Sequence, residues 1–172
     1  MIQEAIIKLS RKQDLERKEM QLSIEEIMEG IATPVQISSF LTASAMKGIT
    51  MDELTAAALA MRQFVTRIKI SKSVVVDTCG TGGDRMGTFN ISTIAALVVA
   101  GAGVCVAKHG NRSVSSKCGS ADLLEALGVK ISLGEKKVKE CIERVGVGFM
   151  FAPIFHPAMK YAQPVRRELG TR

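Results

Sequence analysis

A stretch rich in glycine, acidic residues and hydroxyl groups has the composition of a phosphate-binding loop. Asp77 follows a short apolar run at residues 74–76, and three glycines come after it, Gly80, Gly82 and Gly83. Glycines adopt backbone angles that other residues resist, so several N–H groups can converge on an anion. The polar residues that follow lead into a predicted helix, whose free N-terminal N–H groups and dipole also favour phosphate. They are Asp84, Thr88, Asn90, Ser92 and Thr93.

A second polar segment, at residues 108–120, follows another apolar run at residues 104–107. Because both runs are predicted to be parallel strands, the two polar segments should meet at the carboxyl edge of the sheet, where open α/β sheets bind ligands. His109 has polar neighbours, which favours a ligand contact over a place in the core. The basic and hydroxyl residues of this segment are Lys108, Arg112, Ser113, Ser115, Ser116, Lys117 and Ser120.

The motifs that the sequence lacks restrict the chemistry. The glycine spacing G-x-G-G-D is neither that of a P-loop nor the G-x-G-x-x-G of a dinucleotide site. No Ser-His-Asp or Cys-His pairing is legible, and no two carboxylates have general acid/base spacing. The sequence therefore predicts positioning and charge stabilisation. Transfer from an activated phosphorylated sugar fits, because a good leaving group reduces the need for a protein nucleophile.

Residues 1–70 predict short helices that form a small bundle, with apolar residues at helical spacing. Thr33 suits an N-cap, because a proline follows it at the first helical position. Thr50 and Glu53 form a capping box for a helix that should end near residue 68. The apolar stripes are interpreted as a packed core, part of which can be buried against a second subunit.

From residue 71 onward, strands and helices alternate, which predicts a parallel sheet with right-handed crossovers. The expected strands are residues 74–76, 104–107, 129–133 and 147–151. The expected helices are residues 91–102, a helix capped by Ser120 that runs to residue 127, and residues 135–145. The first of these helices is apolar nearly all round, so it should lie deep in the fold. The chain turns helical again from Pro153, and Pro164 should kink or restart that helix.

Composition narrows the class of protein. With 172 residues, 47% of them apolar, the chain can bury a core, and disorder is excluded. The net charge of +6 suits either nucleic acid or a polyphosphate substrate, but the single Tyr and absent Trp argue against nucleic-acid stacking. Four Cys without C-x-x-C spacing and two His argue against structural zinc. The sequence shows neither a signal peptide nor a membrane span, so we expect a cytoplasmic protein with reduced thiols.

Long ordered motifs follow one another from residue 77 to residue 172, and the resemblance that they carry covers the whole chain, including the helical start. They are DTCGTGGD at residues 77–84, TFNIST at 88–93, VAKHGNRSVSSKCGSAD at 106–122, FAPIFHPAM at 151–159 and PVRRELGTR at 164–172. Together they closely resemble the anthranilate phosphoribosyltransferase family of tryptophan biosynthesis. The resemblance implies transfer of the 5-phosphoribosyl group from phosphoribosyl pyrophosphate to anthranilate, with Mg²⁺ as cofactor. The products would be N-(5-phosphoribosyl)anthranilate and pyrophosphate.

The family's fold is a small helical domain joined to a larger parallel-sheet α/β domain, as in nucleoside phosphorylases, and it usually forms a homodimer through the helices. Applied to this chain, it implies a helical domain at residues 1–70. An incomplete α/β domain for phosphoribosyl pyrophosphate would follow at residues 71–155. A helical segment at residues 156–172 would pack back on the helical domain.

The resemblance also implies residue roles, none of them as a catalytic acid or base, since the neutral amine of anthranilate needs little activation. Ser92 corresponds to a Mg²⁺ ligand. The local residue pattern by itself places Arg166 on a solvated helix face. The resemblance instead implies that Arg166 holds the anthranilate carboxylate through paired charged hydrogen bonds. The implied anthranilate contacts are Gly80, His109, Asn111 and Arg166. The implied phosphoribosyl pyrophosphate contacts are Gly80, Gly83, Asp84, Thr88, Asn90, Ser92, Thr93, Lys108, Gly110, Asn111, Arg112, Ser113, Ser115, Ser116 and Ser120.

Family members continue past the last residue of this chain, with more sheet and an adjacent Asp-Glu pair that binds Mg²⁺. We therefore expect a truncated fold and little activity from this chain alone. Three alternatives stay open: a pyrimidine nucleoside phosphorylase of similar architecture, a nucleic-acid-binding relative of the fold, and a folding or assembly module with unused sites. Asn111 and Arg166, in their full motifs, favour the anthranilate enzyme over the phosphorylase.

Overall fold

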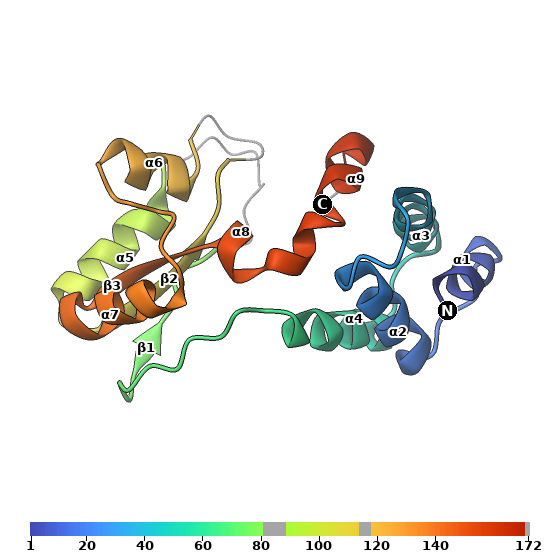
Figure 1. The fold of residues 1–172 in the computed structure, drawn as a ribbon, viewed down its shortest axis with the longest axis horizontal. Coiled ribbons are helices and arrows are strands. Elements are labelled where there is room, and N and C mark those ends of the chain that lie inside the picture. The colour runs from blue at the N-terminus through green and yellow to red at the C-terminus, as the bar shows by residue number, and fades with distance from the viewer. Residues whose placement is uncertain (81–88, 114–117, 171–172) are drawn as a thin grey trace. The chain divides into compact units, whose positions relative to one another are not determined.

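The computed structural model describes residues 1–80, 89–113 and 118–170, and the chain divides into two compact units (Figure 1). The first unit comprises Met1–Val65 and His156–Arg172, and the second comprises Thr66–Phe155. The first is helical and the second contains a parallel sheet, which confirms the predicted fold class. No helix within the described ranges is long and apolar enough to cross a membrane.

The first unit is a bundle in which α2 packs on α4, α1 on α3, and α9 on α3. Thr33 Oγ1 accepts a hydrogen bond from the Gln36 N–H at 3.3 Å, and Thr50 Oγ1 accepts one from Glu53 at 3.2 Å. Both predicted N-caps are thereby confirmed. The elements are α1 (Ile2–Ser10), α2 (Arg17–Met28), α3 (Pro34–Lys47), α4 (Met51–Gln63), the 3-10 helix η1 (Pro157–Lys160) and α9 (Gln163–Leu169).

The core of the bundle includes residues from both ends of the chain. Its buried side chains come from the first four helices and from α9, among them Leu9, Ile27, Ile37, Phe40, Ala60 and Val165. Gly30 has a φ of +78°, and a Cβ there would lie 2.5 Å from Cε1 of Tyr161. The turn after α2 therefore requires glycine both for its backbone angle and for its contact with the C-terminal segment.

Glu53 is the buried polar centre of the bundle, with an exposed fraction of 0%. Its carboxylate accepts hydrogen bonds of 2.8 Å from Leu15 N, Thr50 N and the Lys47 ammonium. Burial alone would raise the pKa of Glu53, but these hydrogen bonds lower it below its usual value. One carboxylate therefore joins the loop before α2 to the start of α4.

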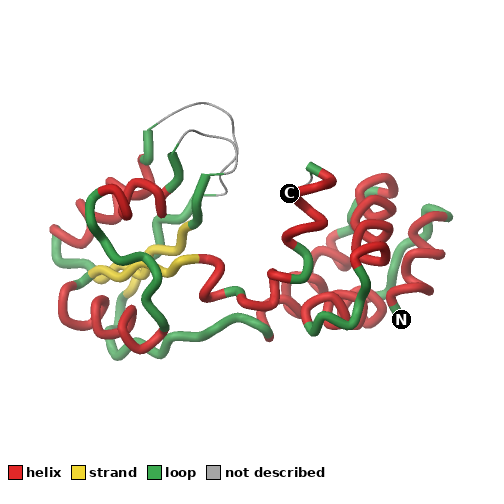
Figure 2. The backbone as a smooth tube through the Cα atoms, turned by 45° about the horizontal axis from the view of Figure 1, so that its top comes forward, coloured by secondary structure: helices red, strands yellow, loops and turns green. Residues whose placement is uncertain are grey.

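The second unit has three parallel strands in the order β1-β2-β3. Figure 2 shows the strands lying between helices. Phe149 and Phe151 pack with the buried apolar residues of α6, whereas Met150 packs with those of α7, so the two faces of β3 carry different helices. The elements are β1 (Val75–Val76), α5 (Ile91–Gly101), β2 (Cys105–Gly110), α6 (Ser120–Ala126), α7 (Glu135–Val145), β3 (Val147–Phe151) and α8 (Ala152–Phe155).

The strand expected at residues 129–133 does not form. Gly128 has a φ of +83°, and the Val129 N–H donates to the Leu124 carbonyl, so this part of the backbone ends α6 instead. Ile131 is buried against Ala121 and Leu124, which explains the apolar pattern without a strand. The described sheet accordingly has three strands where the sequence predicted four.

Three other boundaries differ from expectation. Helix α4 ends at Gln63, because the Thr66 N–H donates to the Phe155 carbonyl and no longer to a helical one. Strand β2 extends to Gly110, because it pairs with β3 as far as Phe151. Helix α6 begins at Ser120, and Gly119 takes the N-cap position assigned to that serine.

The prediction that the apolar helix lies deep in the fold is wrong for most of α5. Thr93 and Ala96 are buried, but four large apolar side chains of this helix are exposed by 46–66%. They are Ile91, Ile94, Leu97 and Val98. One face of α5 packs on the sheet, and its remaining apolar face has too few neighbours within the described residues to be covered.

Replacing Glu53 by Gln should lower the free energy of unfolding by about 3 kcal/mol, because it removes the buried counter-charge of Lys47. The matched control is Asp52→Asn on the same helix, since Asp52 pairs with Arg17 at an exposed site and such pairs contribute little. Urea denaturation of the three proteins measures the difference.

The contribution of Glu53 to the free energy of unfolding should depend on pH in a defined direction. The Glu53 pKa is lower in the folded state, so its stabilisation is present above the pKa of an unfolded glutamate and is lost as the pH falls through the folded value. Glu53→Gln should lose this part of the acid sensitivity. The same urea midpoint for wild type and Glu53→Gln at neutral pH would contradict this account of the network.

Candidate functional site

Parallel pairing brings the first loop to the end of β2. Val76 is paired with Val106, so the residues that follow β1 lie beside the second half of β2. The Asp77 carboxylate oxygen Oδ1 accepts a hydrogen bond from Cys79 N at 2.9 Å and one from His109 N at 3.2 Å. One carboxylate thereby fastens the start of the glycine loop to the neighbouring strand.

Lys108 is the buried cation of this edge, with an exposed fraction of 2%. Its ammonium donates to Ser92 Oγ at 3.3 Å and to the His109 carbonyl at 3.4 Å. Thr78 Oγ1 donates to the Ser92 carbonyl at 2.7 Å, which ties the same turn of α5 to the first loop. Burial lowers the pKa of Lys108, because the charged form loses its hydration.

The start of α5 carries further polar groups. Asn90 occupies the N-cap position, but its side chain accepts no hydrogen bond from the helix, and Nδ2 lies 3.6 Å from Cys118 Sγ. Thr93 is 1% exposed, and its hydroxyl has no hydrogen-bond partner within the described part of the chain. The first turn of α5 is therefore poor in side-chain caps that would compete with an anion.

Asp122 holds both ends of the second loop. Its Oδ2 accepts hydrogen bonds from Ser113 N at 3.0 Å and from Gly119 N at 2.8 Å. These hydrogen bonds lower the pKa of Asp122. At Gly119 an added Cβ would lie 2.3 Å from Ser113 N, and at Gly110 one would lie 2.7 Å from Phe149 Cε2. The two ends of the loop thus require glycine for close packing.

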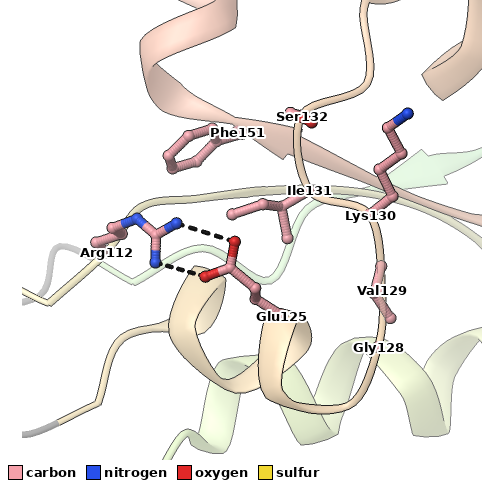
Figure 3. A pocket seen from close by; sticks show the side chains of 8 residues that line it. All are labelled: Arg112, Glu125, Gly128, Val129, Lys130, Ile131, Ser132 and Phe151. Carbon is pink, nitrogen blue, oxygen red and sulfur yellow. Dashed lines mark hydrogen bonds and ion pairs between the residues drawn. The ribbon is translucent and has the colours of Figure 1, made fainter.

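The Arg112 side chain points to the Glu125 carboxylate of α6 (Figure 3). NH1 lies 2.9 Å from Asp122 Oδ1 and 2.8 Å from Glu125 Oε2, and the guanidinium carbon is 5.9 Å from the centre of the Phe151 ring. A shallow pocket of about 300 Å³ lies here, between Arg112, Phe151 and the segment after α6. Of the residues predicted to contact phosphoribosyl pyrophosphate, Arg112 alone lines this pocket, so we do not take it as the substrate site.

Comparison with known protein families identifies the family to which this chain belongs. A family model described as "Glycosyl transferase family, a/b domain" matches residues 72–172, and one described as "Glycosyl transferase family, helical bundle domain" matches residues 3–65. The chain belongs to this glycosyl transferase family. The two matched segments place a helical part before an α/β part.

Curated relatives of this glycosyl transferase family member carry the name anthranilate phosphoribosyltransferase. One from Syntrophobacter fumaroxidans is 57% identical and one from Pelotomaculum thermopropionicum is 58% identical, each over 100% of this chain. The chain spans 51% and 50% of the length of these two relatives, that is, about half. The resemblance drawn from the motifs is thereby confirmed.

Solved structures of similar proteins agree. Anthranilate phosphoribosyltransferase from Thermus thermophilus has a TM-score of 0.88 and 45% identity, covering 98% of this chain and 51% of that one. The enzyme from Saccharomyces cerevisiae, solved in complex with PRPP and Mg, has a TM-score of 0.88 and 27% identity. That comparison covers 99% of this chain and 52% of the yeast chain.

The structure gathers part of the predicted site. Lys108 and Ser92 are in hydrogen-bond contact, Asp77 joins the glycine loop to His109, and Gly80 follows in that loop. Asn111 lies at the end of β2, where its carbonyl accepts from Ala121 N at 3.2 Å. Arg166 lies in α9 of the first unit and is half-buried. Gly83, Asp84, Thr88, Ser115 and Ser116 lie outside the described residues.

One pair at this edge was missed by reasoning from the sequence. Cys79 Sγ lies 3.7 Å from His109 Nδ1. The two residues are thirty positions apart in the sequence. The signal that could have found them is that Cys79 follows the end of β1 and His109 lies near the end of β2, and neighbouring parallel strands end at the same edge of the sheet. Burial and the Asp77 charge raise the pKa of the Cys79 thiol, which argues against a nucleophilic role.

The predicted magnesium ligand does not stand in a complete metal site. Ser92 Oγ accepts a hydrogen bond from the Lys108 ammonium, a cation that opposes a second cation at the same oxygen. Among the described residues, no group of three or more His, Cys, Asp or Glu could hold a metal ion. Hard Mg²⁺ prefers several oxygen ligands, so these residues alone do not fit it.

Replacing Asp122 by Asn should lower the free energy of unfolding by about 1–2 kcal/mol, because two buried or half-buried loop N–H groups lose a charged acceptor. The matched control is Glu125→Gln, which also pairs with Arg112 but accepts from side-chain donors only. Thermal unfolding measures the difference. Equal destabilisation by both substitutions would mean that the Arg112 ion pairs, and not the loop N–H bonds, carry the effect.

Proposed function

We propose that this chain forms part of an anthranilate phosphoribosyltransferase of tryptophan biosynthesis. The observation that carries the proposal is the buried ammonium of Lys108, whose hydrogen bonds within the described part go to neutral oxygens. A buried charge is costly unless it is paired, so this position favours an anionic ligand. The pyrophosphate of phosphoribosyl pyrophosphate would supply that charge, next to the first turn of α5. The names of the close relatives support this substrate pair.

In this proposal the protein acts by position and charge. The neutral amine of anthranilate attacks C1 of the ribose, a C–N bond forms, the C–O bond to pyrophosphate breaks, and the nitrogen releases one proton to solvent. Lys108 and the loop N–H groups stabilise the negative charge on the leaving group. Arg166 holds the anthranilate carboxylate. Arg112 would bind phosphate only after it exchanges its contacts with Asp122 and Glu125.

Mg²⁺ is the cofactor we propose for a protein of the relatives' length. The support is the yeast relative, whose structure is a complex with PRPP and Mg. Because the described residues do not make a metal site alone, further ligands would come from the substrate oxygens and, in a protein of the relatives' length, from the part that this chain does not span. We place the protein in the cytoplasm, where its metabolites occur.

The test is a chimera that joins this chain to the part of the Syntrophobacter fumaroxidans relative that it does not cover. With anthranilate, phosphoribosyl pyrophosphate and Mg²⁺, the chimera should consume anthranilate, seen as loss of its fluorescence. The 172-residue chain alone should show little turnover. A folded chimera that leaves anthranilate unchanged but cleaves pyrimidine nucleosides with phosphate would overturn the proposal in favour of a phosphorylase.

Lys108→Gln in the chimera should weaken binding of phosphoribosyl pyrophosphate by about 10–100-fold, because a hydrogen bond to a charged group contributes about 1.5–3 kcal/mol. Lys136→Gln is the matched control, since Lys136 is an exposed lysine of α7 in the same unit. Steady-state kinetics with varied phosphoribosyl pyrophosphate measures the change. An unchanged KM in Lys108→Gln would remove the main argument for a phosphate at this position.

We also propose that the protein forms a homodimer through its helical unit. Four apolar side chains between the last turn of α3 and the first turn of α4 are exposed by 55–85%: Met46, Ile49, Met51 and Leu54. Such a set on a small bundle is typical of an association surface. The double substitution Met51→Glu and Leu54→Glu should therefore halve the mass measured by light scattering. Leu127→Glu, at a residue 64% exposed in the second unit, should leave it unchanged. A monomeric wild type would refute the dimer.

A further inference from the structure

The paired side chains of Cys79 and His109 have the arrangement of two metal ligands. Sγ and Nδ1 are 3.7 Å apart. Both residues donate their backbone N–H to the same oxygen, Asp77 Oδ1, at 2.9 Å and 3.2 Å. The Asp77 carboxylate therefore fixes the backbone of both residues before a metal ion binds. Cys79 is exposed, so a solute can reach its sulfur.

The distance between the two atoms suits a shared zinc ion. Zinc lies about 2.3 Å from a cysteine sulfur and about 2.0–2.1 Å from a histidine nitrogen, and a tetrahedral angle then places the two donor atoms about 3.5–3.6 Å apart. The 3.7 Å between Sγ and Nδ1 is close to this value, so only a small movement is needed. Thiolate and imidazole are also the ligands that borderline-soft cations prefer over oxygen.

The charges around the pair act in opposite directions. The Asp77 carboxylate faces both residues and attracts a cation, whereas the Lys108 ammonium opposes one. Partial burial of the sulfur, with the Asp77 charge, raises the pKa of Cys79, so its thiol holds its proton more strongly than an ordinary cysteine does. A metal ion must displace that proton, and binding should therefore tighten as the pH rises.

We propose that Cys79 and His109 form a binding site for a thiophilic divalent cation of the Zn²⁺ type, with water in the remaining positions. On binding, one S–metal and one N–metal bond form, and the thiol proton passes to solvent. Within the described residues no third His, Cys, Asp or Glu completes a group of three, so the site is open and weaker than a structural zinc site. The bound ion would join the first loop to β2. This inference does not depend on the proposed transferase activity.

The experiment uses the reduced, metal-free 172-residue chain and Cd²⁺ as an optical probe, because cadmium–thiolate bonds give an ultraviolet charge-transfer band. Wild type should show the band with one ion per chain, and Zn²⁺ should displace it. Cys79→Ser should abolish the band. His109→Gln should weaken binding by at least about tenfold, since losing a group that only orients a metal ligand already costs about that much. Cys118→Ser is the matched control, because Cys118 is also exposed, and it should bind as wild type does.

A second measurement needs no substitution. Zn²⁺ should slow alkylation of Cys79 relative to Cys118, with the labelled peptides separated by mass spectrometry. Circular dichroism of each variant checks that it keeps the wild-type fold. A full cadmium band in Cys79→Ser, wild-type affinity in His109→Gln, or equal alkylation of both cysteines with and without Zn²⁺ would each overturn the proposal and leave only a thiol–imidazole contact.

Discussion

The site depends on the shared hydrogen bonds of the Asp77 carboxylate. Strand β1 is only two residues long and forms two pairs with β2, so ladder bonds alone hold it weakly. Asp77 Oδ1 extends this link beyond the ladder by accepting from Cys79 N and His109 N. The residues that begin the glycine loop, the end of β2 and the Cys79–His109 pair are all positioned through this one oxygen. A carboxylate suits the task because charged acceptors form the stronger hydrogen bonds.

The second constraint is a buried positive charge that has no ion-pair partner among the described residues. Lys108 is nearly inaccessible, and its described hydrogen bonds reach only the Ser92 hydroxyl and a backbone carbonyl. Lys47 of the helical unit shows the contrast, because Asp14 and Glu53 both pair with it. Lys47 is thus neutralised within its unit, whereas the described hydrogen bonds of Lys108 leave its charge available to an anion. Such unpaired groups reduce stability and are retained where binding recovers the cost.

Each unit closes a core of its own, but both leave some large apolar side chains exposed. In the helical unit, side chains from both ends of the chain close one core. In the second unit α5 leaves Ile91, Ile94, Leu97 and Val98 exposed, although its sequence is typical of a deeply buried helix. The apolar pattern of a helix indicates that the helix is suited to burial. Whether the helix is buried depends on other segments, which a local pattern cannot reveal.

The sequence by itself determined the fold class, both threonine N-caps and the alternation of strands and helices that makes the sheet parallel. It also assigned Lys108, Ser92 and Asn90 to the carboxyl edge of that sheet. These follow from local periodicity, from capping chemistry and from the rule that parallel strands end together. Only the tertiary structure decided that residues 129–133 do not form a strand and that Val129 closes the end of α6, that Arg112 faces carboxylates, and that Cys79 meets His109. In each case competing hydrogen-bond partners and close packing select one arrangement, which the local sequence pattern does not specify.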